Sequence, residues 1–549
     1  MNLTWLLKWV KSGLNKWRIA FLIIALIYAA FLILNLAYMS AQWDEVVHLD
    51  GGLFLLRGNI HQFQAWNSFY PPMYDFLTTG FFAIGGASLF MGRFVSVVFS
   101  LLSVYAVFEF TYRMYNPKTA LLASVMLAIM PGFIWLSRVA MIETTLVFFF
   151  TVSTLSFFLW LKEHKNKFFI LSAVTFIFGV LTKYQTVIVG IIAVVALAFL
   201  GRNYLMQKFR TIPRLILGIV VVAVPLILFL YWYYSAGMMN QWLYAMNIGN
   251  PDKTVYSTGL NRFPAWFDPL PTWIQLPLFY LIEIVQPYPS IHPISLVLYA
   301  VGLAGLALLA LRRKPEDKYL LIWFVVVYVF FTAIPNRQWR YLVPLFVVLA
   351  ISGANLITSA LSKGQKTWNI PNLNLNKKRV LQIASGLLIV SILAGVAYSV
   401  NDAYTWVASD QINIPIQETA NYLGNHLAQN QSAVIVCAFN LLDQDLFQFY
   451  LPATAPISQV WQYPDMPVDT YPPNFNVTEF INLCEQRNVK YMILYDYGAN
   501  SPFYNSTLTY SNVLEMIYAT NRFGVSTDQP NFGVMPHRIF LVRFNQTQT

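Results

Sequence analysis

The chain has 549 residues, of which 57% are hydrophobic and 11% are charged, and its mean hydropathy is +0.53. These values exclude an ordinary water-soluble enzyme and an intrinsically disordered chain. The net charge of +11 does not indicate nucleic-acid binding, because the Lys and Arg residues lie in short clusters between long apolar runs. That arrangement is the positive-inside pattern of a membrane protein.

The first apolar run, residues 19–39, carries no charge and is long enough to cross the hydrocarbon core of a bilayer as a helix. Similar runs along the chain predict about eleven transmembrane helices. Every second loop between them is basic, so we expect the N-terminus in the cytoplasm and the C-terminus outside. The predicted spans are 19–39, 89–112, 119–137, 143–161, 167–183, 185–200, 213–233, 291–311, 319–335, 340–360 and 380–400.

Two adjacent carboxylates, Asp44 and Glu45, follow the first span and are expected at the membrane surface. They form a candidate catalytic centre, in which we assign Asp44 as the general base. Asp44 and His48 are four residues apart, so on a helix they share a face and could share a hydrogen bond or a divalent metal ion. One Asp and one His are a weak metal signal, and we favour a base without a metal. Glu45 points about 100° away and is expected to orient Asp44 or cap a short helix.

The two longest loops before Asn401, residues 40–88 and 234–290, are both expected on the outer face. The second loop is rich in Trp, Tyr and Pro. Amphipathic aromatic side chains favour the level of the lipid headgroups. This loop is therefore expected to lie flat on the membrane with an interfacial helix, or to form a lid over a site below.

After Asn401 the composition becomes mixed and polar, with short β-type runs at 433–439 and 491–495 and a helical stretch at 477–488. Alternating strand and helix patterns predict a small extracytoplasmic α/β domain over residues 401–549. It contains both cysteines, for which two buried thiols are favoured over a disulfide. Four glycosylation sequons fit an outward-facing domain. The cysteines are Cys437 and Cys484, and the sequons begin at Asn430, Asn476, Asn505 and Asn545.

Charged side chains gather at the predicted outer ends of the helices, where the positive-inside rule does not expect Lys and Arg. Such charges are costly unless they face a polar cavity, and a bidentate guanidinium suits a phosphate, which a lipid would present at this depth. The alternative for any single Arg or Lys is a headgroup anchor that snorkels. The set is Asp44, Glu45, His48, Arg57, Arg93, Arg138, Glu143, Lys183, Arg337 and Arg340.

Motifs of soluble enzymes, such as a nucleotide-binding glycine loop or a GxSxG elbow, do not occur. Several short motifs in chain order instead resemble the GT-C integral-membrane glycosyltransferases. The resemblance is closest to the branch with dolichyl-phosphate-mannose protein mannosyltransferases and the bacterial lipid A aminoarabinose transferase. The motifs are Trp43-Asp-Glu45, Gly52-Leu-Phe-Leu-Leu-Arg-Gly58, Tyr70-Pro-Pro-Met-Tyr74, Gly92-Arg-Phe-Val-Ser96, Ser137-Arg-Val-Ala-Met-Ile-Glu143, Gly179-Val-Leu-Thr-Lys183 and Arg337-Gln-Trp-Arg-Tyr-Leu-Val-Pro344.

This resemblance implies an all-α polytopic catalytic domain of GT-C type over residues 1–400, before the α/β domain. It also implies a hexosyl- or pentosyltransferase that uses a polyprenyl-phosphate sugar donor, of the dolichyl-phosphate type, and a protein, lipid or glycan acceptor on the outer face. Asp44 would be the catalytic base or the group that positions the acceptor, with Glu45 beside it. The donor phosphate would be bound by Arg138, Lys183, Arg337 and Arg340, and the acceptor side would be shaped by Arg57, Tyr70 and Glu143.

Two positions depart from the family pattern. Tyr70 stands where the family often has Lys or His, and Glu143 replaces the commoner Asp. The sequence specifies no cofactor with certainty, and a divalent metal at Asp44 and His48 stays open. The main alternative is a polytopic lipid or solute transporter, which the grouping of charges at helix ends and the lack of internal repeats disfavour. A catalytically silent membrane scaffold is a third reading.

Overall fold

The computed structural model describes most of the chain in two compact units. The first contains residues 1–34, 67–77 and 93–409, and the second contains residues 35–66, 78–92 and 410–549. The described residues are 15–66, 70–201, 271–285, 292–334, 338–367, 394–405, 412–436, 442–456, 459–464, 475–495, 510–524, 530–534 and 537–545, with a few single positions between 220 and 235 and positions 386 and 390.

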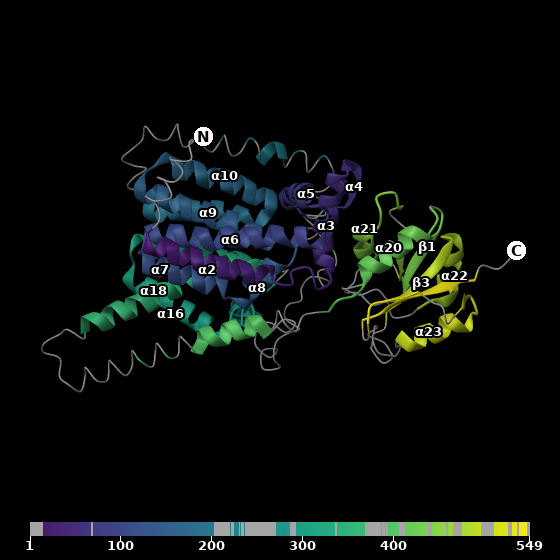
Figure 1. The fold of residues 1–549 in the computed structure, drawn as a ribbon. Helices are drawn as coiled ribbons and strands as arrows, with labels where there is room; N and C mark the ends of the chain where they lie inside the picture. Colours follow the sequence, from purple (N-terminus) through teal and green to yellow (C-terminus); the bar gives the residue numbers. More distant parts are fainter. Residues whose placement is uncertain are drawn as a thin grey trace. The chain divides into compact units, whose positions relative to one another are not determined.

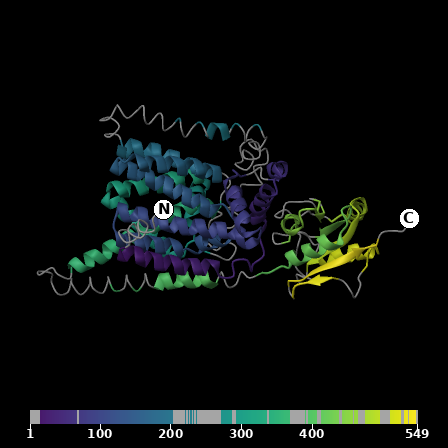
Figure 2. The same ribbon diagram turned by 45° about the horizontal axis from the view of Figure 1, so that its top comes forward.

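The first unit is a bundle of helices that lie side by side in Figures 1 and 2. Five helical segments of the described residues are long and apolar enough to span a membrane, and a sixth counts if a bent pair forms one span. The chain is therefore a multi-pass integral membrane protein. Its helices are α2 (Lys16–Ile33), α6 (Leu89–Met114), α7 (Pro117–Ala128), α8 (Pro131–Arg138), α9 (Glu143–Glu163), α10 (Asn166–Thr182), α11 (Val187–Ala196), α15 (Thr272–Glu283), α16 (Leu296–Arg312), α17 (Pro315–Ala333) and α18 (Val343–Thr367).

Nine of the eleven predicted spans coincide with described helices of the bundle. The predicted spans 213–233 and 380–400 lie mostly outside the described residues, so a total of about eleven remains a prediction. One span differs in shape: residues 119–137 form α7 and α8, which meet at a bend of 65°. Pro131 begins α8, and because proline has no N–H to donate, it interrupts the hydrogen-bond ladder of α7.

Helix α9 is the centre of the bundle and packs against α10, α11 and α18. Its apolar residues are buried on nearly every side, whereas in α2 only Phe21, Tyr28 and Leu32 are buried. Small residues allow neighbouring helices to approach closely. A Cβ atom on Gly305 of α16 would lie 2.3 Å from the backbone of Ser352 in α18, so only glycine fits this helix crossing.

The second unit combines outer helices with the predicted α/β region. Helices α3 (Trp43–Leu56) and α4 (Ile60–Trp66) occupy the predicted loop 40–88, and α3 packs against α21 (Gln444–Tyr450). Helix α5 (Met73–Gly85) also lies in this loop and contributes its last turns to this unit. The remaining helices are α20 (Ile416–His426), α22 (Val477–Gln486) and α23 (Tyr510–Ala519).

The sheet of this unit has the order β2-β1-β3-β6-β4, with β5 paired to β6. Strands β1, β2 and β3 are parallel, and β6 runs antiparallel to β3. The runs predicted at 433–439 and 491–495 are β1 and β3, and the helix predicted at 477–488 is α22. The strands are β1 (Ser432–Val436), β2 (Val460–Tyr463), β3 (Val489–Tyr495), β4 (Phe523–Gly524), β5 (Asn531–Phe532) and β6 (Ile539–Phe544).

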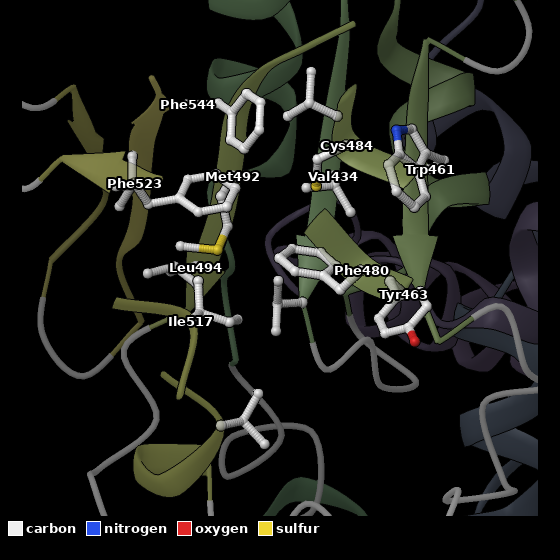
Figure 3. Close-up of a cluster of buried hydrophobic side chains, with 14 of the residues drawn as sticks. Val434, Trp461, Tyr463, Phe480, Cys484, Met492, Leu494, Ile517, Phe523 and Phe544 are labelled. Atoms are coloured by element: carbon white, nitrogen blue, oxygen red, sulfur yellow. The ribbon is translucent and has the colours of Figure 1, made fainter. Parts of the chain in front are cut away.

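One face of this sheet packs against α22 and α23 through an apolar cluster (Figure 3). Phe480 and Cys484 of α22 are fully buried there, four residues apart on one face of the helix. Cys484 is a free, buried thiol. Cys437 lies outside the described residues, so the expectation of two thiols is met for one cysteine only.

Candidate active site

A break between α10 and α11 places a lysine inside the helical bundle. Helix α10 ends at Thr182, Lys183 is in an extended conformation, and a single turn of 3₁₀ helix (Tyr184–Thr186) leads into α11. Gly179 lets this turn fold back, since a Cβ atom there would lie 2.6 Å from Thr186. A charged side chain at a helix break between apolar segments marks a functional site more often than a structural one.

Lys183 forms an ion pair with Glu143, the first residue of α9. The Nζ atom donates to Oε1 at 3.0 Å, and the two residues are 3% and 1% exposed. The N-terminal turn of α9 favours a negative charge on Glu143. Removing one partner of such a buried pair typically costs roughly 3–5 kcal/mol, because the other charge is left without compensation.

A second wall of this site comes from a short 3₁₀ helix, Trp339–Leu342, that precedes α18. The ring of Tyr341 faces Lys183, with its centroid 5.4 Å from Nζ, a cation–π distance. Trp339 in the same turn is buried and stacks on Phe346, which holds the turn in place. Glu143, Lys183 and Tyr341 thus meet in the first unit, and Arg340 belongs to the same turn as Tyr341.

Arg340 and Arg138 each have a local hydrogen bond. The Nε of Arg340 donates to Oε1 of Gln338. One amino group of Arg138, at the end of α8, donates to the carbonyls of Phe31 and Leu32 at 3.1 and 2.7 Å. Arg138 therefore caps the carboxyl end of α2, where a cation is favourable. Its predicted contact with the donor phosphate stays a prediction.

Arg93, at the start of α6, was noted in the sequence as an outer charge without a specific role. It is 1% exposed and close enough to Arg138 for the two positive charges to interact. Two neighbouring guanidinium groups in a buried setting favour a nearby anion. The signal in the sequence was an arginine near the start of a predicted membrane span.

The outer acidic residues lie on α3 in the second unit. Asp44 is in the first turn and half-buried, and His48 lies one turn further along and is buried. Glu45 is fully buried, and its Oε2 accepts a hydrogen bond from the backbone N–H of Gln42 at 2.9 Å. Glu45 therefore caps the helix, as expected from its position beside Asp44. Arg57 ends α3 and is exposed.

Sequence reasoning missed Asp50, two turns below Asp44 on the same helix. Both of its carboxyl oxygens are buried and have no hydrogen-bond partner among the described residues. Burial raises the pKa of the Asp50 carboxyl well above its usual range; Asp445 and Asp443 raise it further, and Arg57 opposes them. The group is thus favoured in its neutral form at the contact between α3 and α21.

Tyr70 and Arg337 are the remaining residues of the predicted site. Tyr70 is half-buried and precedes Pro71 and Pro72, which lead into α5. Arg337 lies outside the described residues. Within the part of the chain that the structure describes, no three or more His, Cys, Asp and Glu side chains are grouped to hold a metal ion. Among these described residues, Asp44 and His48 supply two donors, fewer than a complete metal site needs.

The described chain thus combines a helical membrane bundle, a helix break with a buried lysine and a small α/β region. Residues 70–232 match the model of the family described as dolichyl-phosphate-mannose-protein mannosyltransferase. This range includes Arg93, Arg138, Glu143 and Lys183. The resemblance predicted from the sequence is therefore confirmed.

Solved structures with the same fold extend over nearly the whole chain. ArnT from Cupriavidus metallidurans in the apo state shares 13% identity, with 96% of this chain and 97% of that chain covered and a TM-score of 0.56. The same protein bound to undecaprenyl phosphate gives 13% identity, 96% and 98% coverage and a TM-score of 0.55. The apo oligosaccharyltransferase of Archaeoglobus fulgidus shares 15% identity, with 90% of this chain and 71% of that chain covered and a TM-score of 0.52. Among the curated proteins, none matches the sequence of this chain.

Proposed function

We propose that this protein is a glycosyltransferase that moves a sugar from a polyprenyl-phosphate donor to an acceptor on the outer face of the membrane. The observation that carries this proposal is the buried Lys183, held in a helix break beside Tyr341 and within the segment that matches the mannosyltransferase model. A solved protein with the same fold binds undecaprenyl phosphate. The N-terminus is assigned to the cytoplasm, and residues 401–549 to the outer side.

The chemistry requires little more than a base and a set of cations. The acceptor hydroxyl attacks C1 of the sugar, the bond from C1 to the phosphate oxygen breaks, and the polyprenyl phosphate leaves with the bonding electrons. Asp44 takes the hydroxyl proton, while Glu45 fixes the first turn of α3 around it. Lys183 and Arg340, with Arg138 and Arg337, stabilise the charge that grows on the phosphate, so no general acid is needed.

The remaining assignments concern the acceptor and the lipid. Arg57, Tyr70 and Glu143 are assigned to the acceptor side or to the shape of the site. The polyprenyl chain is held against apolar helix surfaces by burial, at about 0.8 kcal/mol per CH₂ group. A donor delivered by a lipid does not need a nucleotide-binding loop, which agrees with the lack of such a motif in the sequence.

Asp44→Asn tests the base. The variant keeps the size of the side chain but cannot accept the proton, so we expect sugar transfer to fall by roughly 10²–10⁴-fold, with binding of undecaprenyl phosphate unchanged. His48→Ala is the control for a metal shared with Asp44. If Asp44 acts without a metal, transfer by His48→Ala should be insensitive to chelators, as transfer by the wild type should be. Full transfer by Asp44→Asn would rule out Asp44 as the base, and a transporter or scaffold would give no transfer in either protein.

The donor and acceptor are to be identified by mass spectrometry of glycolipids and glycoproteins from cells with and without the gene. A glycan that disappears on deletion and returns with the wild-type chain defines the acceptor class. The Asp44→Asn chain should not restore it. Unchanged glycolipids and glycoproteins after deletion would contradict the proposed activity.

A further inference from the structure

The ion pair between Lys183 and Glu143 has a consequence for the order in which ligands bind. The pair is buried, with Nζ and Oε1 3.0 Å apart, and the face of Tyr341 covers the ammonium group. A phosphate that reaches Lys183 arrives beside a carboxylate. Two anions at such distance repel strongly where water is scarce, so both cannot share the ammonium group at low cost.

The two lipids of the reaction differ in charge. A sugar-bearing polyprenyl phosphate is a phosphodiester with one negative charge. The polyprenyl phosphate that leaves is a monoester with a charge of about −1.5 to −2 at neutral pH. The sugar of the donor also presents hydroxyl groups that can donate hydrogen bonds to a carboxylate, and the product has no such groups. Glu143 therefore repels the product more strongly than the donor. The product also lacks the sugar hydroxyl groups whose hydrogen bonds would offset this repulsion.

We propose that Glu143 is the resident counter-ion of Lys183, that it exchanges with the incoming donor phosphate, and that it thereby favours the sugar-bearing donor over the polyprenyl phosphate product. This inference rests on the proposed function. In the empty site Glu143 keeps Lys183 charged and in place. With donor bound, Lys183 turns to the phosphate and Glu143 accepts hydrogen bonds from the sugar. After transfer the carboxylate has lost the sugar, and it recovers Lys183 as the product leaves.

The position of Glu143 supports this exchange. As the first residue of α9, it lies where the helix N-terminus stabilises a carboxylate even without its lysine. Lys183 lies outside regular helix, in the extended residue between α10 and the next turn, and its long side chain can change direction without moving either helix. The exchange needs a side-chain rotation and no rearrangement of the bundle.

The test measures binding of undecaprenyl phosphate to the full chain in detergent micelles, with wild type and Glu143→Gln. The glutamine keeps the size and accepts a hydrogen bond from Lys183, but it carries no charge. We expect the variant to bind undecaprenyl phosphate roughly tenfold or more tightly than wild type, since like charges in contact cost several kcal/mol. Equal or weaker binding by Glu143→Gln would overturn the exchange.

Glu316→Gln is the matched control. Glu316 pairs with Lys162 at 2.6 Å in the same unit, so its loss removes an ion pair without touching Lys183. The control should bind undecaprenyl phosphate as wild type does. Equally tightened binding in both variants would show a general effect of net charge and would also overturn the exchange.

A double variant, Glu143→Leu with Lys183→Met, guards against misfolding of the single one. Apolar replacement of a buried ion pair is often neutral for stability, and this protein should bind undecaprenyl phosphate at least tenfold more weakly than wild type. Unchanged affinity in the double variant would show that Lys183 is not a phosphate ligand. A wild-type chain that binds no undecaprenyl phosphate would overturn the proposed function as well, whereas normal wild-type binding with an unaltered Glu143→Gln affinity overturns only the exchange.

Discussion

Two buried clusters in this protein have opposite chemical character. In the first unit, Lys183 and Glu143 are charged side chains removed from water at a break in a helix. In the second unit, the cluster between the sheet and α22 is apolar, with Phe480 and Cys484 in its interior. Burying the charged pair costs free energy that the pair recovers only in part, while burying the apolar cluster contributes to folding.

This difference indicates that one cluster serves function and the other serves stability. An apolar cluster of this kind is explained by stability alone. A charged pair within membrane helices is a poor way to gain stability, because apolar residues of the same volume often serve as well. This contrast supports the proposed ligand-binding role of the first cluster and a structural role for the second, so variants in each cluster should have effects of different kinds.

Among variants in these two clusters, Lys183→Ala should have the largest effect on activity. Per mole of folded protein, we expect sugar transfer to fall by about 10²–10³-fold, the usual loss when one group that stabilises transition-state charge is removed. Transfer and folded yield are to be measured on the same preparation by product analysis and size exclusion. A loss confined to the yield, with normal transfer by the folded fraction, would make Lys183 a structural residue and remove the distinction between the clusters.

Phe480→Ala should have the opposite profile. The side chain is fully buried among aromatic neighbours, with Phe475 and Phe523 at centroid distances of 5.4 and 5.9 Å. Its truncation should destabilise the second unit by roughly 3–5 kcal/mol. Limited proteolysis of residues 410–549 across a denaturant series is the measurement. Phe540→Ala, at a position only partly buried against the same cluster, should cost less. Similar losses for both variants would contradict a well-packed core.

Much of this architecture is predictable because it follows local patterns. The apolar runs identify α6 and α9, and the β-type runs identify β1 and β3, since each pattern reports burial over consecutive residues. The boundary between α10 and α11 is also visible, because Lys183 interrupts an apolar stretch. The bend between α7 and α8 was missed, although Pro131 was a usable signal for it.

Tertiary pairings could not be predicted in the same way. Glu143 and Lys183 are 40 positions apart, and nothing in either local sequence specifies the other as partner. The capping of α2 by Arg138 likewise depends on where two helices end in space. Asp50 was overlooked because an acidic residue in a predicted outer loop is ordinarily exposed, whereas packing of α3 against α21 buries it. The tertiary contact that buries Asp50 joins α3 to a helix about 400 residues later in the chain, and no local pattern specifies it.

The smallest expected effect is the slow alkylation of the Cys484 thiol. Its rate reports on the packing of the apolar cluster and requires no substitution within that cluster. Burial raises the pKa of the Cys484 thiol to about 12, with Arg522 lowering it and Glu485 raising it. Because the thiolate is the reactive species, the native protein at pH 8 should alkylate at Cys484 at a rate far below that of a free thiol. The folded form favours the neutral thiol, so reactivity should rise only as the pH approaches that pKa or as the unit opens.

The measurement is mass spectrometry after iodoacetamide treatment in a Cys437→Ser background, with and without denaturant. Denaturant should expose Cys484 to full alkylation, and Phe480→Ala should speed its alkylation in buffer, because the same helix face loses its packing. Rapid alkylation of the folded Cys437→Ser protein would show that the cluster is open. A peptide joined through Cys437 and Cys484 in the wild-type chain would contradict two separate thiols, and it would attribute part of the stability of the second unit to a covalent link and not to apolar burial alone.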